Sequence, residues 1–255
     1  MDKKKKILRI LGFASLFLVI VGYLAYYMFV LSEPDPNEVC TAVELVMEDA
    51  VDAQFISQSD VESMLTRANL YPQGKTMKAI DADAIEKTVS ANPFVEEVSC
   101  YKSPTGKVIV NVKQRTPVVY VIPDGKKGFF LDEAGVKIPN VRYVKNIVVA
   151  TGDIDDKYAA GDLLDFACFL QGDDFWNAQI EQVYVRRDRK QKRVVELVPR
   201  VGDHVIYLGD MSGYRDKLER LRLFYEKAIG TVGWNKYSKI NLEYGNQIIC
   251  TKRRK

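Results

Sequence analysis

The sequence predicts an α+β protein with a single N-terminal transmembrane helix, a compact domain of order strand–helix–helix–strand–strand, and a mostly antiparallel β-domain with flanking helices. Three observations support this prediction. Residues 10–31 contain no charged residue, residues 38–116 place two helical apolar stripes between strand patterns, and residues 117–250 consist mainly of short strands separated by Gly and Pro turns.

Residues 10–31 predict the membrane-spanning helix. At ~1.5 Å per residue this stretch is roughly 33 Å long, enough to cross a hydrocarbon core of about 30 Å. A cleavable signal peptide has a shorter apolar core, usually ~7–15 residues, and ends at a small-x-small site. Residues 32–37, SEPDPN, offer no such site and instead predict a short stiff linker. We therefore expect a retained anchor.

The charges that flank the anchor predict its orientation. The basic tail, residues 1–9, carries five lysines and arginines against one acid, whereas the first base after the anchor is Arg67. Lys and Arg beside the first span stay in the cytoplasm, so the N-terminus is expected there and everything after Leu31 outside.

Residues 38–116 carry the signals of the first domain. Ser57 followed by Asp60 is typical of a capping box, Asp81 can cap a second helix, and Asn92-Pro93 ends it. Two amphipathic helices can cover one face of a three-stranded sheet. The expected elements are a strand in 38–48, helices starting after Ser57 and Asp81, and hairpin strands at 95–101 and 108–112.

Residues 117–250 predict the second domain. Alternation places Ile240, Leu242 and Tyr244 in the last strand, facing the core, with an open backbone edge beyond them. The basic residues in 251–255 are expected to form a short tail that protects this edge from aggregation. The other expected elements are strands at 118–122, 128–132, 136–139, 146–150, 183–185, 194–198 and 204–208, and helices at 157–170 and 214–228.

The chemistry-bearing residues argue against an enzyme. The only histidine, His204, lies inside a predicted strand, and no nucleophile elbow, phosphate loop, dinucleotide turn or zinc helix motif occurs. Asp153, Asp155 and Asp156 lack the spacing of a calcium loop. We expect no catalytic residue, no cofactor, no metal and no small-molecule substrate. The net charge of +3, with five bases in the tail, also argues against nucleic acid as a partner.

Two features stay open at this point. Cys40, Cys100, Cys168 and Cys250 show no C-x-x-C spacing; they could form disulfides in any of three pairings, or be four separate buried side chains. The basic turn 186–193 could contact anionic lipid or an acidic segment of another protein, or be a solvated hairpin tip.

Four local patterns, in order and at fitting distances, carry a resemblance to the FtsQ/DivIB family of bacterial cell-division proteins. These patterns are residues 92–122 (NPFVEEVSCYKSPTGKVIVNVKQRTPVVYVI), 128–139 (GFFLDEAGVKIP), 201–225 with its Leu-Gly stop before a helix, and 239–244 (KINLEY). The sequence departs from the family pattern at Phe94, at Gln114-Arg115 and in the last strand, where Asn241 and Glu243 replace an acid and a base.

The resemblance implies a POTRA domain over 38–116 and a β-domain over 117–250. It also implies a non-enzymatic single-pass scaffold of the divisome in the inner membrane at the septum, with periplasmic domains. The scaffold would link early and late division proteins by binding FtsB/DivIC- and FtsL-like partners through the C-terminal strand edge. The implied partner-binding residues are Glu243, Tyr244, Gly245, Asn246, Gln247 and Ile248, with Arg193 as an electrostatic neighbour.

Alternatives to this interpretation come from other classes. Glu243 would change the charge that the partner must present, and Tyr244 could be a core residue only. A POTRA-type module that assists protein export or envelope assembly is the alternative function. A membrane-anchored cell-wall enzyme is disfavoured by the missing catalytic motifs.

Overall fold

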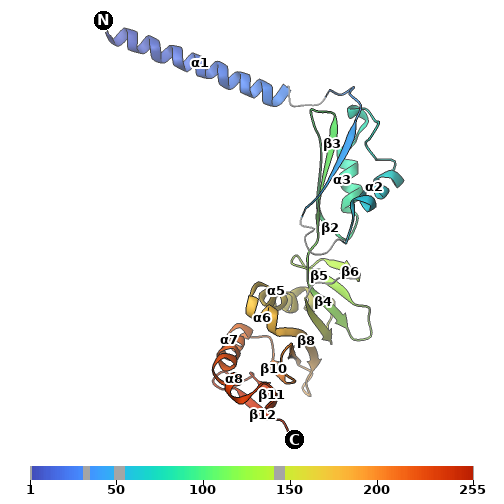
Figure 1. The fold of residues 1–255 in the computed structure, drawn as a ribbon, viewed down its shortest axis with the longest axis vertical. Coiled ribbons are helices and arrows are strands. Elements are labelled where there is room, and N and C mark those ends of the chain that lie inside the picture. Colours follow the sequence, from blue (N-terminus) through green and yellow to red (C-terminus); the bar gives the residue numbers. More distant parts are fainter. Residues whose placement is uncertain (1, 31–34, 49–54, 141–146, 255) are drawn as a thin grey trace. The chain divides into compact units, whose positions relative to one another are not determined.

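The computed structural model describes residues 2–30, 35–48, 55–140 and 147–254, and within the first helix the side chains of residues 12–27. The chain divides into unit 1, Met1–Gln114, and unit 2, Arg115–Lys255 (Figure 1). Part of the expected linker, the expected strand start at Asn146 and the final residue of the expected tail lie outside the described residues.

Helix α1, Asp2–Val30, contains the stretch that the sequence predicts to be a membrane anchor. Its described apolar side chains are exposed; Phe13, Phe17 and Leu18 are examples. Across the described residues, however, no helix combines the length and the hydropathy needed to cross a membrane.

The rest of unit 1 has the predicted order of elements. Its three described strands form a sheet of order β1-β3-β2, with β1 and β3 parallel and β2 and β3 antiparallel. After α1, unit 1 contains β1 (Ala42–Glu48), α2 (Gln58–Arg67), a 3-10 turn η1 (Met77–Ala79), α3 (Ala82–Ser90), β2 (Val95–Lys102) and β3 (Lys107–Gln114).

The helix starts of unit 1 confirm the capping predictions. The amide of Asp60 donates to the Ser57 hydroxyl, and the Asp60 carboxylate accepts from the Ser57 amide at 2.9 Å, which is a capping box. Asp81 Oδ1 accepts from the Ala84 amide at 3.0 Å at the start of α3. The helices then bury Val61, Leu65, Ile85 and Val89 in the same core as the valines of β3.

Unit 2 is built on one large sheet. In the described residues its nine strands follow the order β12-β11-β10-β9-β8-β7-β4-β5-β6, and five of the eight pairings are antiparallel. Its strands are β4 (Pro117–Pro123), β5 (Phe129–Asp132), β6 (Lys137–Pro139), β7 (Val148–Gly152), β8 (Ile180–Arg187), β9 (Arg193–Pro199), β10 (Val205–Gly209), β11 (Tyr237–Asn241) and β12 (Ile249–Lys252).

Helices cover one face of this sheet, as Figure 1 shows for α5, α6, α7 and α8. Residues of alternating strand positions, such as Val183, Leu197 and Ile240, pack there against Phe166, Leu170 and Leu221 from the helices. The helical elements are α4 (Asp156–Tyr158), the π-helical η2 (Ala159–Leu163), α5 (Leu164–Gly172), α6 (Asp174–Gln179), α7 (Tyr214–Phe224), the π-helical η3 (Tyr225–Ile229) and α8 (Gly230–Val232).

Three features of unit 2 differ from the prediction. Helix α6, capped by Asp173, was not expected, and the helix expected at 157–170 contains the π-helical segment around Gly161, whose backbone dihedrals are not helical. Residues 251 and 252, expected in a tail, belong to β12.

The four cysteines are free thiols, and Cys40 and Cys100 are buried, which favours the prediction of separate buried side chains over disulfides.

Candidate partner-binding site

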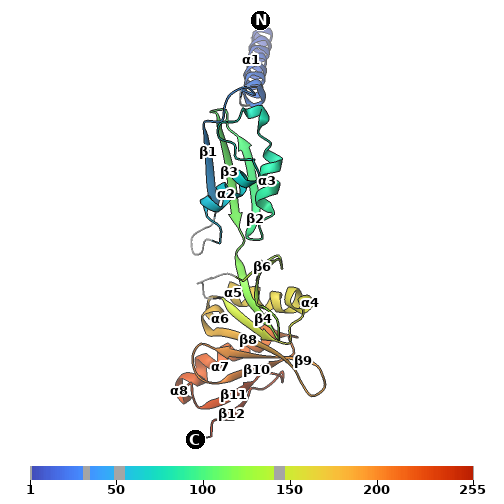
Figure 2. The same cartoon turned by 90° about the vertical axis from the view of Figure 1, so that its right-hand side faces the viewer.

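The C-terminal edge of the large sheet is formed by β12. This strand pairs antiparallel with β11, matching Ile249 with Asn241 and Thr251 with Lys239, and it ends the described strand order (Figure 2). The edge that the sequence assigns to residues 240–244 is therefore covered, and that prediction is wrong. Because β12 has a strand neighbour on one side only among the described residues, the open edge lies one strand further out.

Residues 243–248 form the turn between β11 and β12. The Asn241 side chain accepts a hydrogen bond from the Glu243 amide at 2.9 Å, an Asx-type contact that ends the strand. Leu242 is still fully buried, but Tyr244 is 49% exposed. The prediction that Tyr244 faces the core is therefore wrong, because strand alternation stops at Asn241. Glu243 to Gln247 are all exposed, and Ile248 packs partly against the core.

An arginine of α7 holds this turn in place. The Arg220 guanidinium donates to the carbonyl oxygens of Tyr244 and Gly245 at 2.5 Å and to that of Leu242 at 3.1 Å. Hydrogen bonds from a charged donor are stronger than neutral ones. One side chain thus fixes the backbone of the turn from outside the core.

Arg193 is placed elsewhere in unit 2. It begins β9, donates to the Asp155 carboxylate, and lies with its guanidinium 4.6 Å from the centre of the Tyr158 ring. Its Nε atom is also 3.6 Å from Asp153 Oδ2. Within the described residues its polar partners lie next to β7, and the structure does not bring Arg193 together with residues 243–248.

The sheet face opposite the helices carries a charged and aromatic cluster beside β11. Glu196 accepts from Arg186 at 2.9 Å and from Lys239 at 3.3 Å, and Lys239 Nζ lies 4.2 Å from the centre of the Tyr207 ring. Burial opposes ionisation of Glu196, but the Arg186 hydrogen bond and the charges of Arg186 and Lys239 outweigh it and lower its pKa. The cluster is internally paired and fixes the side chains next to the edge.

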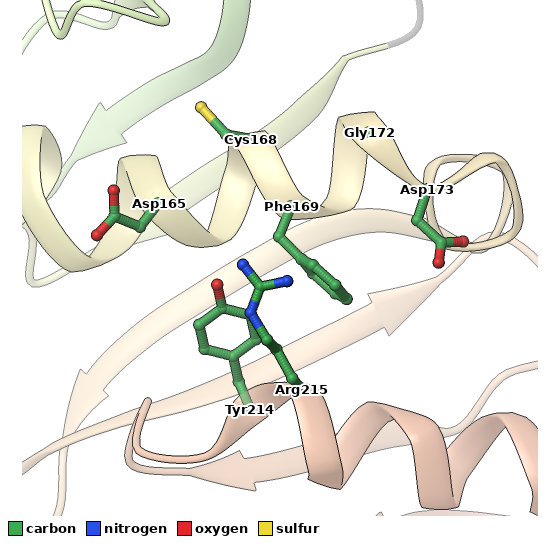
Figure 3. A pocket seen from close by; sticks show the side chains of 7 residues that line it. All are labelled: Asp165, Cys168, Phe169, Gly172, Asp173, Tyr214 and Arg215. Atoms are coloured by element: carbon green, nitrogen blue, oxygen red, sulfur yellow. The ribbon is translucent and has the colours of Figure 1, made fainter.

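A pocket of about 630 Å³ lies between α5 and the start of α7. Figure 3 shows the Arg215 guanidinium beside the rings of Phe169 and Tyr214, with Cys168 pointing away from them. Burial, together with nearby acids, raises the pKa of the Cys168 thiol, so the thiol stays protonated at neutral pH. Cys168 is therefore not an activated nucleophile.

His204, considered above as the one potential catalytic imidazole, is fully buried. Its Nε2 lies 2.7 Å from the Tyr225 hydroxyl, and its ring stacks on Trp234 with centroids 6.3 Å apart. Burial is the main cause that lowers the pKa of His204, so the ring is neutral at pH 7. It acts as a packed core side chain.

Sequence reasoning missed Arg220 and β12. Gly245-Asn246, followed by the β-branched residues of 248–251, is a hairpin signal that could have indicated β12. Arg220 has no comparable signal, because its role depends on where α7 packs relative to the turn.

Comparisons with known proteins agree with this architecture. Residues 116–251 match a family model described as FtsQ/DivIB, C-terminal related, and residues 38–113 match a POTRA-like domain. No curated protein sequence matches the chain. Among solved structures, the chain is similar to the major extracytoplasmic domain of the trans isomer of the cell-division protein DivIB from Geobacillus stearothermophilus. That similarity has 16% identity and a TM-score of 0.34, and it covers 47% of this chain and 98% of that chain. Because the first family model spans more than half of the 255 residues, the chain belongs to the FtsQ/DivIB family.

Proposed function

We propose that the protein is a non-enzymatic scaffold of the bacterial divisome, holding FtsB/DivIC- and FtsL-like partners at the edge formed by β12 and residues 243–248. The observation that carries this proposal is the open edge of β12 at the end of the described strand order, next to an exposed turn. Family membership supplies the cellular context.

The chemistry of the edge fits an extended partner. An exposed strand offers backbone donors and acceptors to an added strand, and its side chains provide specificity. Ile249 is 43% exposed and Thr251 is exposed on the same face, while Cys250 packs toward the helices. A partner strand would gain main-chain hydrogen bonds and bury Ile249.

Membrane attachment is part of the same proposal. Residues 10–31 would span the inner membrane, with residues 1–9 in the cytoplasm, 32–37 as a linker, and the domains at 38–116 and 117–250 outside, at the septum. The uncharged sequence of residues 10–31 and the exposed apolar side chains of α1 support this arrangement.

Site-specific photocrosslinking in living cells tests the edge. A photoreactive amino acid at Ile249 should crosslink FtsB/DivIC- or FtsL-like proteins, identified by mass spectrometry. The matched control is Val136, which is 39% exposed and lies beside β6 at the opposite end of the strand order. Crosslinks of equal yield from both positions, or none from Ile249, would contradict the proposal.

Point variants test partner binding at this edge better than a truncation does. Deleting residues 239–255 would also remove Ile240 and Leu242, both fully buried, so the fold would be lost together with binding. Side-chain changes at Ile249 and Thr251 leave this core intact.

A module that assists export or envelope assembly is the second candidate, favoured by the POTRA-like match over 38–113. The crosslinking separates the two functions. Capture of export or envelope-assembly proteins from Ile249, with division proteins absent, would support this second function.

A further inference from the structure

The open end of the β11–β12 hairpin, opposite the turn, forms a basic cleft. The cleft has a volume of about 330 Å³ and is lined by Asn235, Lys236, Lys252, Arg253 and Arg254. Pairing of Tyr237 with Lys252 joins the two strand ends, and the Arg253 amide donates to the Lys236 carbonyl at 3.0 Å. The two strand ends thus contribute cations to one site.

Three of the four cations that line the cleft have no carboxylate partner among the described residues. Arg253 is already paired with Asp203: it donates to the Asp203 carbonyl at 2.7 Å and lies 3.6 Å from the Asp203 carboxylate. In the part of the chain that the structure describes, Lys236, Lys252 and Arg254 are exposed and have no carboxylate partner. The cleft therefore attracts an anionic group.

The cleft is built on a rigid support. Asn235 Oδ1 accepts from the Asp203 amide at 3.2 Å, which ties one wall to the loop before β10. Next to Asn235, Trp234 stacks on His204 and meets Tyr225 edge-on at 5.0 Å. A packed aromatic cluster therefore holds the residue next to this wall of the cleft in place.

The other basic surface of unit 2, the turn 186–193, is paired with acids at its base and carries exposed cations at its tip, Arg189, Lys190 and Lys192. In the turn 186–193, Arg186 pairs with Glu196, Arg187 with Asp153 and Arg193 with Asp155. These arginines are already neutralised by acids of the same unit. The cleft differs from the turn in its position, because it includes Lys252, the last residue of β12, whereas the turn joins β8 and β9.

We propose that the basic cleft binds an acidic segment that flanks the partner strand on β12. This inference rests on the proposed function and adds the chemistry that selects the partner. At about 3.3 Å per residue, a strand that pairs with β12 reaches the cleft within a few residues of its paired part. The acidic residues precede the paired part if the partner runs antiparallel to β12, and follow it if the partner runs parallel.

A peptide experiment tests the cleft directly. Two fluorescein-labelled peptides are titrated with the full chain in detergent micelles. Both contain a segment of four alternating threonines and valines; one carries three glutamates before this segment and the other carries them after it. Matched peptides carry three lysines in place of the glutamates. We expect one glutamate peptide to bind at least about tenfold more tightly than its lysine counterpart, with a preference that declines as salt rises. If each glutamate peptide binds with the same affinity as its lysine counterpart, the inference is overturned.

Two charge-matched variants locate the binding. Lys236→Glu with Lys252→Glu and Arg254→Glu should remove the preference for glutamate. Arg189→Glu with Lys190→Glu and Lys192→Glu, in the exposed tip of the turn 186–193, changes the net charge equally and should retain it. Equal loss in both variants means general charge attraction, which contradicts the inference.

Vesicles of phosphatidylglycerol provide the lipid comparison. If the cleft variant loses vesicle binding but keeps its peptide preference, the site is a lipid site and the inference fails.

Crosslinking from Ile249 in the cleft variant separates this inference from the proposed function. If the unmodified chain crosslinks division proteins and the cleft variant does so equally well, the cleft plays no part while the edge still binds. If the unmodified chain gives no crosslink, the proposed function itself fails, and the inference about the partner fails with it.

Discussion

The two ends of the β11–β12 hairpin differ in charge and in how they are held. At the turn end, Arg220 on α7 holds three carbonyl groups of an exposed loop that carries Glu243. At the open end, three cations without a carboxylate partner in the described part of the chain line a cleft, and Trp234, next to its wall, stacks on the buried ring of His204. One end is fixed from the surface and the other from the core.

This difference separates binding from stability. Changes at the turn end should alter the loop and its contacts without unfolding unit 2, because the hydrogen bonds of Arg220 lie outside the core. Changes under the open end should lower the free energy of unfolding of unit 2, because they remove packing from the core cluster. Each variant below tests one side of this comparison.

Trp234→Ala should have the largest effect on stability. Its indole is partly buried and meets both His204 and Tyr225, so its removal should cost about 2 kcal/mol of unfolding free energy, below the full cost of a buried Trp→Ala change. Urea unfolding followed by the fluorescence of Trp176, the other tryptophan, measures it, since Trp176 is fully buried in unit 2.

Tyr244→Ala is the matched control at the turn end. Its ring is 49% exposed, and we expect a change of less than about 0.5 kcal/mol. Similar losses in the two variants would remove the distinction between a core-held and a surface-held end.

The sequence was sufficient to predict the elements whose signals are local. Ser57 and Asp60 specify a helix start by themselves, as does Asp81, and the structure confirms both. In unit 1, periodicity and caps were enough to predict the order of the elements, whereas the parallel pairing of β1 with β3 joins the first and the last of its strands. The separate buried state of Cys40 and Cys100 was one of two open alternatives.

The candidate site was harder to predict because contacts between side chains and the backbone, rather than periodicity, decide it. Asn241 ends β11 through its own side chain, and this turns Tyr244 out of the alternation that predicted it to be buried. Gln114 departs from the family pattern, and its side-chain oxygen accepts from the amides of Phe55 and Ile56, a contact that spans more than fifty residues of sequence. No local pattern contains such information.

Arg220→Ala should have the next largest effect, and at the turn end only. Losing hydrogen bonds to three carbonyl groups should lower stability by about 1 kcal/mol, since the site is partly exposed. Hydrogen exchange measured by mass spectrometry should become faster in residues 242–248 and stay unchanged around His204.

Arg215→Ala on the same helix is the control for Arg220. Arg215 lies over the rings of Phe169 and Tyr214, a contact worth about 0.5–1 kcal/mol at an exposed site, and does not touch the turn. If exchange in 242–248 rises equally in this variant, the turn depends on α7 as a whole rather than on Arg220.

Acidification should act on the open end. Burial lowers the pKa of His204 in the folded protein below the value of about 6.5 in the unfolded chain. As pH falls below about 6.5, the unfolded chain therefore binds a proton that the folded protein does not, and stability declines until the folded pKa is reached. His204→Gln should show a smaller decline between pH 7.5 and pH 5 in urea titrations; an identical decline would mean that other groups cause it.

Glu243→Arg should have the smallest effect on stability and is the sharpest test of the charge difference. The side chain is exposed beside Gly209, and we expect a change within about 0.5 kcal/mol. It makes the turn end basic like the open end, so a glutamate-bearing peptide should bind the variant a few-fold more tightly, mainly through faster association. Glu243→Gln should give about half of this change. Affinity that is equal in all three proteins would show that the bound segment does not reach the turn, and the two ends of the hairpin would then serve different contacts.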